Sequence, residues 1–339
     1  MRVSFLVTYY NQEQYVRQSM ESILAIDKPC EWEILVGDDG STDGTIQAVE
    51  EYVKKYPNHI KLFVMPREDN KKYESLKRVS ENRLNLLEHA EGDFFCTLDG
   101  DDYYCDTGFI EDSLTAFKND KNISVVAFGY RNVTNGVEGE DHILPLKKCQ
   151  GFIDKSLYLK SFYIHAGACV YKKIWGHDRL EYIKNIGYFD DNDILINNLN
   201  YGSMYAFNRA IYAYRQTGIS IFTSMNEVER AVLNVEGHDV DLKLIQEKYR
   251  EDLFKRNSKS IITMYIWKNH LKKLFGEDKY ERYLTAFNGI QNSIGYKIMI
   301  FDQLTSAEKK YLKTKIRKLE KNEIKFTVKT IIKKIIRGL

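Results

Sequence analysis

Apolar and polar residues alternate along residues 1–130 in two rhythms, which predict strands and helices in turn. Short apolar runs predict strands over residues 2–8, 33–36, 60–65, 94–98 and 124–129. Between these runs, apolar residues spaced three or four positions apart predict helices over residues 14–25, after Asp43 and over residues 76–90. Such alternation is typical of βαβ units, so we expect a mostly parallel sheet flanked by helices.

The pattern is weaker after residue 130. Residues 132–150 contain Asn135-Gly136 and mixed polar side chains, which predict a hairpin or a flexible loop. Further strands are expected over residues 166–171 and 204–214, with a helix over residues 190–200 that begins in carboxylates. From Glu227 onward the pattern is almost wholly helical. We therefore expect an α/β domain over residues 1–222, with halves at 1–105 and 106–222, and an α-helical extension over residues 223–339.

Carboxylates gather at the ends of two predicted strands. Thr97-Leu98-Asp99-Gly100-Asp101-Asp102 follows an apolar run, and Val36-Gly37-Asp38-Asp39 ends the second strand. Buried carboxylates are costly without a positive partner, and Mg²⁺ or Mn²⁺ held together with a diphosphate is a natural one. Because the carboxyl ends of parallel strands share one edge, both clusters would face one crevice. The alternatives are a solvated acidic turn for the first cluster and helix capping near Asp43 for the second.

The composition supports a folded protein with a full core, since 43% of the 339 residues are hydrophobic and 13% are aromatic. The five cysteines include no CxxC pair, so neither a zinc site nor a disulfide framework is indicated, and a reducing, cytoplasmic location is expected. The strand at residues 2–8 argues against a signal peptide. The sequence contains no uninterrupted apolar run of about 18 residues, so no membrane-spanning helix is expected.

The charge is concentrated at one end of the sequence. Residues 308–339 hold 12 Lys or Arg and 3 Asp or Glu, whereas the whole chain has a formal charge of only +2. One apolar stripe on a lysine-rich helix would be formed by Ile324, Val328, Ile331, Ile332 and Ile335. Such a helix is typical of an anchor on an anionic membrane surface, with docking on the protein's own core as the alternative. Nucleic acid is not expected, because no aromatic-interleaved basic face accompanies the tail.

Five motifs follow one another in order along the chain. They are Val3-Ser4-Phe5-Leu6-Val7-Thr8-Tyr9-Tyr10-Asn11, Val36-Gly37-Asp38-Asp39-Gly40-Ser41-Thr42-Asp43-Gly44-Thr45, Leu98-Asp99-Gly100-Asp101-Asp102, Tyr188-Phe189-Asp190-Asp191-Asn192-Asp193-Ile194-Leu195 and Tyr214-Arg215-Gln216. Over about residues 1–222 the series resembles the family 2 glycosyltransferases of the bacterial surface-polysaccharide type, which have the GT-A fold. Gly37 stands where another residue is common, and Leu84 follows Arg83 where the family usually has asparagine.

The resemblance implies a nucleotide-sugar site at the ends of the first, second and fourth strands. Asp39 would accept a hydrogen bond from the N3–H of uracil or thymine. Asp101 of the DxD motif would ligate Mn²⁺ or Mg²⁺, and Asp99 would lie near the ribose or share the ion. The other expected nucleotide contacts are Thr8 and Tyr10, mainly through the backbone, and Arg83.

The acidic segment at residues 188–195 implies the catalytic base. Asp191 would take the proton from an acceptor hydroxyl as that oxygen attacks the anomeric carbon, and a single displacement inverts the configuration. Asp190 is the second candidate. Alternatively, the carboxylates of Asp190, Asp191 and Asp193 form a helix N-terminus, and both roles can hold together. For Arg83, a surface salt bridge is the alternative.

We therefore expect a metal-dependent inverting glycosyltransferase that moves a sugar from a nucleotide diphosphate, with a UDP-sugar favoured, to a hydroxyl of a glycan or lipid-linked glycan. It would act at the inner face of the plasma membrane, and homo-oligomer formation stays open. One alternative is a sugar-nucleotidyltransferase, which would carry a Gly-rich basic loop where Tyr9-Tyr10-Asn11-Gln12-Glu13 stands. Another is a non-catalytic relative that serves as a scaffold in a polysaccharide-synthesis complex.

Overall fold

The computed structural model describes residues 1–253 except 69–70, 72, 145, 147, 162, 187 and 218–226, together with residues 277, 280, 281, 284 and 285. The chain divides into two compact units. The first is Met1–Asn226 with Gly237–Arg256, and the second is Glu227–Glu236 with Asn257–Leu339. The site lies in the first unit. Both the domain boundary expected near residue 222 and the basic stripe expected after residue 308 lie outside the described residues.

Four parallel strands form the first half of the sheet. They are β1 (Arg2–Tyr9), β2 (Glu31–Asp38), β3 (Ile60–Val64) and β4 (Phe94–Asp99), in the order β3-β2-β1-β4. All four were predicted from their apolar runs, and the parallel arrangement agrees with the alternation of strands and helices. The carboxyl ends of β2, β1 and β4 therefore lie side by side at one edge.

The second half of the sheet is mixed. The strand β9 (Cys169–Lys172) runs antiparallel between β4 and β6 (Ile123–Thr134), and β10 (Ser203–Arg215) runs parallel to β6. Three short strands complete it: β5 (Tyr103–Tyr104) and β8 (Gln150–Ile153) pair with β10, and β7 (Val137–His142) pairs with β6. The strand expected over residues 166–171 was placed too early. Ala166–Ala168 is a turn of 3₁₀ helix, because the His165 side chain accepts a hydrogen bond from the Gly167 N–H and starts that turn.

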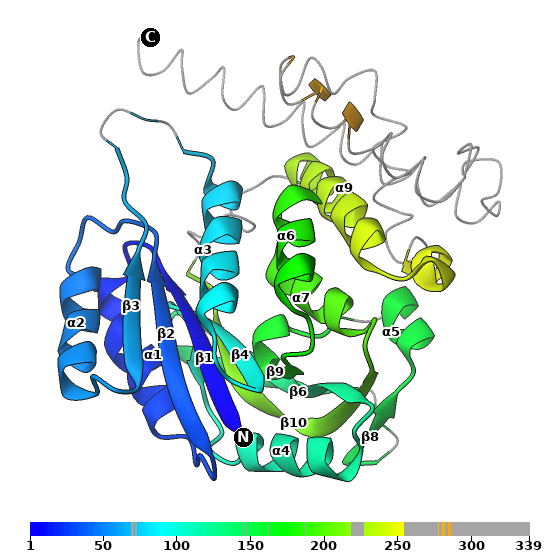
Figure 1. The fold of residues 1–339 in the computed structure, drawn as a ribbon, viewed down its shortest axis with the longest axis horizontal. Coiled ribbons are helices and arrows are strands. Elements are labelled where there is room, and N and C mark those ends of the chain that lie inside the picture. The colour runs from blue at the N-terminus through cyan, green and yellow to red at the C-terminus, as the bar shows by residue number, and fades with distance from the viewer. Residues whose placement is uncertain are drawn as a thin grey trace. The chain divides into compact units, whose positions relative to one another are not determined.

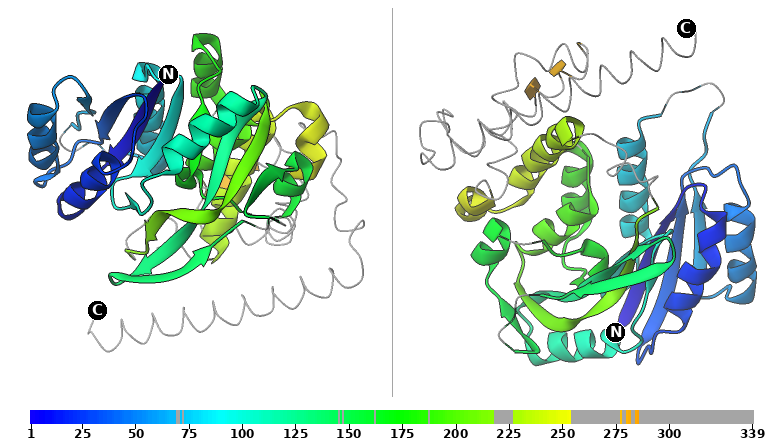
Figure 2. Two further views of the ribbon diagram at one scale, coloured as in Figure 1. Left: turned by 90° about the horizontal axis from the view of Figure 1, so that it is seen from below. Right: turned by 180° about the vertical axis from the view of Figure 1, so that it is seen from behind.

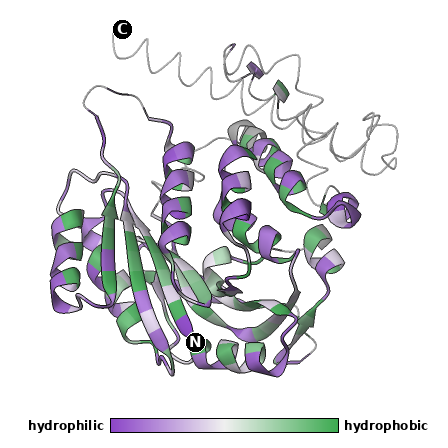
Figure 3. Cartoon of the chain, in the orientation of Figure 1, coloured by the Kyte–Doolittle hydropathy of each residue, from purple (hydrophilic) through white to green (hydrophobic). Residues whose placement is uncertain are grey.

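Helices cover both faces of the parallel half (Figures 1 and 2). The helices α1 (Glu13–Leu24) and α2 (Thr45–Lys55) lie on one face and α3 (Ser75–His89) on the other. In β1, Val3, Phe5 and Val7 pack into the core with α1 and α2. Leu6 and Thr8 point to the opposite face, beside Leu86 of α3. Hydrophobic residues accordingly fill the strands, and hydrophilic residues face outward on the helices (Figure 3).

The remaining described helices are α4 (Phe109–Asn119), α5 (Lys155–Ser161), α6 (His177–Ile186), α7 (Asp191–Asn198) and α9 (Glu227–Leu244). The analysis of the sequence predicted α7 and the helical character after Glu227, but not α4, α5 or α6. The expected hairpin at residues 132–150 is present: β6 turns into β7 at Asn135 and Gly136, whose φ angles of 52° and 78° suit a tight hairpin turn. Among the described residues, no helix is both long and apolar enough to cross a membrane.

Candidate functional site

The end of β1 lies between the two acidic strand ends. In the sheet, Thr8 is in register with Gly37 of β2 on one side and with Asp99 of β4 on the other. Backbone hydrogen bonds extend this alignment beyond the strands, from the Asp39 N–H to the Tyr9 carbonyl and from the Gly100 N–H to the Thr8 carbonyl, both at 2.9 Å. The fold therefore brings the two predicted clusters to one edge.

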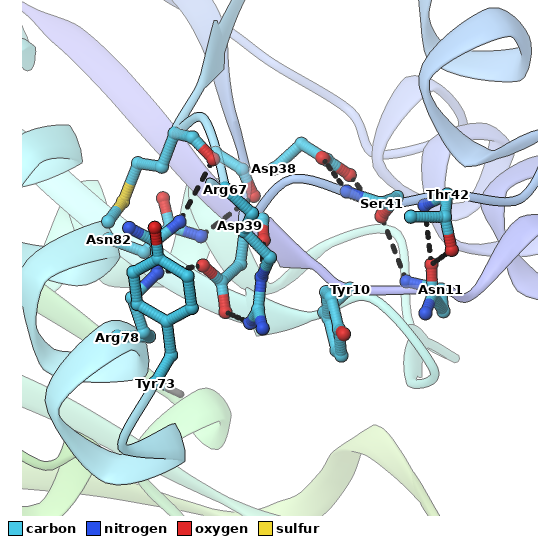
Figure 4. A network of polar contacts seen from close by, with 12 residues as sticks. Tyr10, Asn11, Asp38, Asp39, Ser41, Thr42, Arg67, Tyr73, Arg78 and Asn82 are labelled. Carbon is cyan, nitrogen blue, oxygen red and sulfur yellow. Dashed lines mark hydrogen bonds and ion pairs between the residues drawn. The ribbon is translucent and has the colours of Figure 1, made fainter. Parts of the chain in front are cut away.

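Two arginines hold the carboxylate of Asp39 (Figure 4). Arg67 Nη2 lies 2.5 Å from Asp39 Oδ2, and Arg78 Nε donates to Asp39 Oδ1. Arg67 also donates through Nε to the Asp39 carbonyl at 2.6 Å, and Arg78 donates through Nη2 to the Met65 carbonyl at 2.9 Å. Although Asp39 is buried, each of its oxygens can accept a further hydrogen bond. The guanidinium of Arg67 lies 4.1 Å above the ring of Tyr10, which is 43% exposed.

Helix capping does not account for Asp38 or Asp39, because the N-cap residue of α2 is Gly44. Asp38 accepts hydrogen bonds from the backbone N–H and the hydroxyl of Ser41, at 2.7 and 2.6 Å. Asp43 accepts from the Thr45 N–H at 3.0 Å at the start of α2. Asp39 thus has a separate environment, made of two arginines and an accessible aromatic ring. Sequence reasoning did not single out either arginine, because they lie in no motif and reach Asp39 from 28 and 39 residues away.

The turn after β4 concentrates negative charge. Asp102 is buried and accepts hydrogen bonds from the Tyr212 hydroxyl and the Arg215 N–H, both at 2.7 Å. Burial, and then the charges of Asp101 and Asp99, raise the pKa of Asp102 well above its usual range. Burial and the Asp99 carboxylate also raise the pKa of Asp101 to about 6. Carboxylates that are buried and mutually repulsive fit a hard divalent cation, which would compensate both effects.

Arg83 connects this turn to the N-terminus of α7. Its Nη2 lies 3.3 Å from Asp99 Oδ1, and its Nη1 lies 3.7 Å from Asp190 Oδ1. The Arg83 side chain is only 12% exposed, whereas the carboxylate side chains of Asp99 and Asp190 are 40% and 63% exposed. Burial lowers the pKa of the Arg83 guanidinium, but the charges of Asp99 and Asp191 outweigh burial and raise it. The Thr8 hydroxyl donates to the same Asp99 oxygen at 3.2 Å.

The three carboxylates at the start of α7 have different hydrogen-bond partners. Asp190 and Asp193 form a capping box, in which the Asp190 N–H donates to Asp193 Oδ2 at 2.6 Å and the Asp190 side chain accepts from the Asp191 N–H. Asp191 accepts from the N–H of Asn192 through Oδ1, and its Oδ2 has no hydrogen bond to any described residue. Helix capping therefore occupies Asp190 and Asp193 and leaves one Asp191 oxygen for other partners.

The sequence profile of Glycosyl transferase family 2 matches residues 4–175, which is 172 of the 339 residues. The chain belongs to this family. The match covers the two acidic strand ends described above but stops before α7, so membership in the family rests on the parallel half and on part of the second half of the sheet.

Named relatives match a shorter segment of the chain. The chain is 37% identical over 101 residues to the putative glycosyltransferase EpsE of Bacillus subtilis, covering 30% of this chain and 33% of that protein. It is 38% identical over 104 residues to the poly(ribitol-phosphate) β-N-acetylglucosaminyltransferase TarS of Staphylococcus aureus, covering 30% of this chain and 17% of TarS. The matched segments therefore span a third or less of these relatives.

Solved structures extend the likeness to the fold of most of the chain. A crystal structure of residues 1–349 of S. aureus TarS in complex with UDP-GlcNAc superimposes with a TM-score of 0.56 at 19% identity, covering 87% of this chain and 82% of that one. The same TarS fragment in complex with UDP gives a TM-score of 0.55. The expected GT-A fold, a central sheet flanked by helices, is thereby confirmed.

Proposed function

We propose that this chain is an inverting glycosyltransferase that transfers a sugar from a nucleotide diphosphate, with a UDP-sugar favoured, to a hydroxyl of a glycan or lipid-linked glycan. The observation that carries the proposal is the double contact of Arg83 with Asp99 and Asp190. It places the DxD turn beside the acidic N-terminus of α7, so that groups suited to the diphosphate and to the acceptor proton lie together. The UDP and UDP-GlcNAc complexes of TarS support the choice of donor.

In this proposal, Asp39 recognises the uracil ring of the nucleotide. Its carboxylate accepts the N3–H of uracil while Arg67 and Arg78 fix its orientation, and Tyr10 supplies an aromatic face beside it. Thr8 lies between Asp39 and Asp99 at the strand ends, and its hydroxyl donates to Asp99. The register of β1 with both neighbours thus sets the spacing between the base-reading and diphosphate-binding groups.

Asp191 acts as the general base. It accepts the proton of the acceptor hydroxyl as that oxygen forms a bond to the anomeric carbon, and the bond from this carbon to the diphosphate breaks. The electron pair of that bond leaves with the nucleoside diphosphate, so charges and atoms balance. One displacement on the face opposite the leaving group inverts the anomeric configuration. Asp190 is the less suited candidate, because it caps α7 and pairs with Arg83.

Asp101 and Asp99 would hold Mn²⁺ or Mg²⁺. When bound, such an ion neutralises the negative charge that develops on the departing diphosphate. Arg83 keeps Asp99 in place, and Arg215 closes the turn by donating to the Asp101 carbonyl. The acceptor, the inner face of the plasma membrane and contact of the basic tail with anionic lipid are further parts of the proposal, and they rest on the sequence alone.

The test is release of UDP from a panel of UDP-sugars by the full-length chain. We expect release with Mn²⁺ or Mg²⁺, loss with excess EDTA, and loss in Asp101→Asn. Asp178→Asn is the matched control, because Asp178 lies in the first turn of α6, away from the site, and its removal should leave release intact. Release that is insensitive to EDTA, or an active Asp101→Asn variant, would contradict the proposed function.

A further inference from the structure

His165 is a buried histidine that lies beside the carboxyl end of β4. It immediately precedes the 3₁₀ turn Ala166–Ala168, and its Nδ1 accepts a hydrogen bond from the Gly167 N–H at 3.2 Å. The strand β9 runs antiparallel to β4, with Tyr171 beside Phe95, so the segment that leads into β9 passes along the carboxyl end of β4. The 3₁₀ turn accordingly packs against both β4 and α7.

Three tyrosine rings fix the orientation of this imidazole. Its centroid lies 4.5 Å from that of Tyr212, 5.1 Å from that of Tyr214 and 5.2 Å from that of Tyr130. The Tyr212 hydroxyl donates to Asp102 at 2.7 Å, so a single aromatic ring separates His165 from the DxD turn. The position of the imidazole is therefore coupled to that turn through printed contacts of one side chain.

One ring nitrogen of His165 has no partner among the described residues. Because Nδ1 accepts a hydrogen bond, the proton of the neutral imidazole is on Nε2. Nε2 makes no hydrogen bond to the part of the chain that the structure describes, but it is not a fully enclosed atom, so solvent reaches it although His165 is only 5% exposed. Burial lowers the pKa of His165 to about 4, so the ring is neutral at pH 7. A buried residue thus presents one N–H donor at its exposed edge.

The elements around His165 carry the two ends of the proposed reaction. In that reaction the diphosphate lies at the DxD turn and the acceptor hydroxyl lies at Asp191, so the transferred sugar occupies the space between them. Arg83 reaches Asp99 at 3.3 Å and Asp190 at 3.7 Å, so these two ends are adjacent. Because the 3₁₀ turn packs against both β4 and α7, His165 borders the position of the transferred sugar.

We propose that the Nε2–H of His165 donates a hydrogen bond to an oxygen of the transferred sugar and thereby helps to select the donor. This inference rests on the proposed function and adds a specificity-determining residue to it. A sugar that presents a hydroxyl or acetamido oxygen at this position satisfies the N–H. A sugar without that oxygen leaves the donor unpaired in a site from which water has been displaced, which costs affinity.

The test compares the affinities of UDP and of UDP-sugars for the full-length chain, by isothermal titration with Mn²⁺. The UDP-sugars are UDP-GlcNAc, UDP-GalNAc, UDP-glucose and UDP-galactose. In His165→Asn, the amide oxygen can still accept from the Gly167 N–H, but no N–H reaches the position of Nε2. We expect this variant to bind the best UDP-sugar about three- to tenfold more weakly than the wild type does, and to bind UDP equally well. His165→Gln, whose terminal N–H reaches about as far as Nε2, should retain the binding of the UDP-sugar.

Analogues of that UDP-sugar, each without one oxygen-bearing group, identify the contact. One analogue should bind the wild type about three- to tenfold more weakly than the parent, whereas His165→Asn should bind this analogue and the parent alike. The matched control is His142→Asn, since His142 stacks on Tyr130 at 4.7 Å but its Nε2 already contacts the Asn132 amide at 2.8 Å. This control should bind like the wild type, and thermal unfolding checks that each variant is folded.

The inference is overturned if His165→Asn binds the UDP-sugar as tightly as the wild type does, or if it binds UDP and the UDP-sugar more weakly to the same extent, which would indicate a structural role. It is also overturned if His165→Asn and His165→Gln behave alike, or if no analogue distinguishes the wild type from His165→Asn. Failure of the proposed function is distinguishable, because the wild type would then neither bind UDP nor release it from UDP-sugars.

Discussion

Arg83 holds Asp99 at 3.3 Å across the junction between α3 and β4. The same guanidinium reaches Asp190 at 3.7 Å, so one side chain of α3 fixes the positions of two acidic segments that are 91 residues apart in sequence. A planar group with several fixed N–H donors can serve two carboxylates at once. The relative placement of the DxD turn and the N-terminus of α7 therefore depends on this arginine.

Replacement of Arg83 by lysine should lower the efficiency of UDP-sugar turnover, because an ammonium cannot reproduce the geometry of the guanidinium at both carboxylates. We expect a loss in kcat/KM of about 10- to 100-fold, in line with the loss of one charge-assisted hydrogen bond and one ion pair. Arg131→Lys is the control, since Arg131 also bridges two carboxylates but lies on the β6–β7 hairpin. Equal effects of the two substitutions on release of UDP would argue against a special role for Arg83.

Asp191→Asn should lower the rate of sugar transfer without weakening the binding of UDP. The amide cannot take up a proton, so we expect transfer to fall about 10²- to 10⁴-fold while the Kd for UDP stays near the wild-type value. The fold should persist, because the capping box of α7 uses Asp190 and Asp193. Steady-state kinetics and UDP titration measure the two effects, and a variant with near wild-type turnover would remove Asp191 from the mechanism.

Asp101→Asn should stabilise the metal-free protein while it abolishes metal-dependent turnover. Burial and the neighbouring Asp99 raise the pKa of Asp101 to about 6. The folded state thus favours its protonated form, and that contribution to stability is lost as pH rises through about 6. At pH 8 in EDTA, removal of the charge should raise the free energy of unfolding by about 1–2 kcal/mol, allowing for partial exposure. Urea unfolding measures this, and a destabilised variant would contradict the charge cluster.

Because of His165, the free energy of unfolding should decrease as the pH falls below about 6.5. Burial lowers the pKa of its imidazole to about 4, and Nδ1 accepts a hydrogen bond from the Gly167 N–H at 3.2 Å. Below the unfolded value of 6.5 the unfolded state takes up a proton that the folded state refuses, so stability declines from pH 6.5 to about 4. The decline should reach about 3 kcal/mol and be absent from His165→Asn, which can still cap the 3₁₀ turn. Identical pH profiles in urea unfolding would refute this.

Local pattern was sufficient for the strands of the parallel half, because β1, β2 and β4 contain apolar runs buried on both faces. The edge strand β3 is more exposed but was recognised from the apolar residues among its five positions. The helix α4 was missed although Phe109, Ile110, Leu114 and Phe117 are buried at helical spacing, so its signal was present in the sequence. The position of β9 in the sheet could not be predicted from local pattern. Its antiparallel insertion between β4 and β6 joins segments more than 40 residues apart, and no local pattern encodes such a pairing.

In the candidate site too, some residues could be predicted from the sequence and others could not. Motif order singled out the aspartates, Thr8 and Arg83, but not Arg67 and Arg78, which hold Asp39. Gly37, which departs from the usual family pattern, makes room for Asn82: a Cβ at position 37 would lie 2.0 Å from Asn82 Oδ1, and Asn82 donates to the Gly37 carbonyl at 3.0 Å. A contact between residues 45 positions apart becomes visible only once α3 is packed on β2.

The central claim is that Asp39 and the DxD turn bind one nucleotide. Its most direct test is isothermal titration of UDP in the presence of Mn²⁺ into the wild type, Asp39→Asn and the control Asp106→Asn, whose carboxylate is also held by an arginine, Arg209 at 3.0 Å. We predict that Asp39→Asn weakens binding about tenfold or more, because the charge-assisted hydrogen bond to N3–H is lost, while Asp106→Asn binds like the wild type. Equal affinity of all three proteins for UDP would contradict the account.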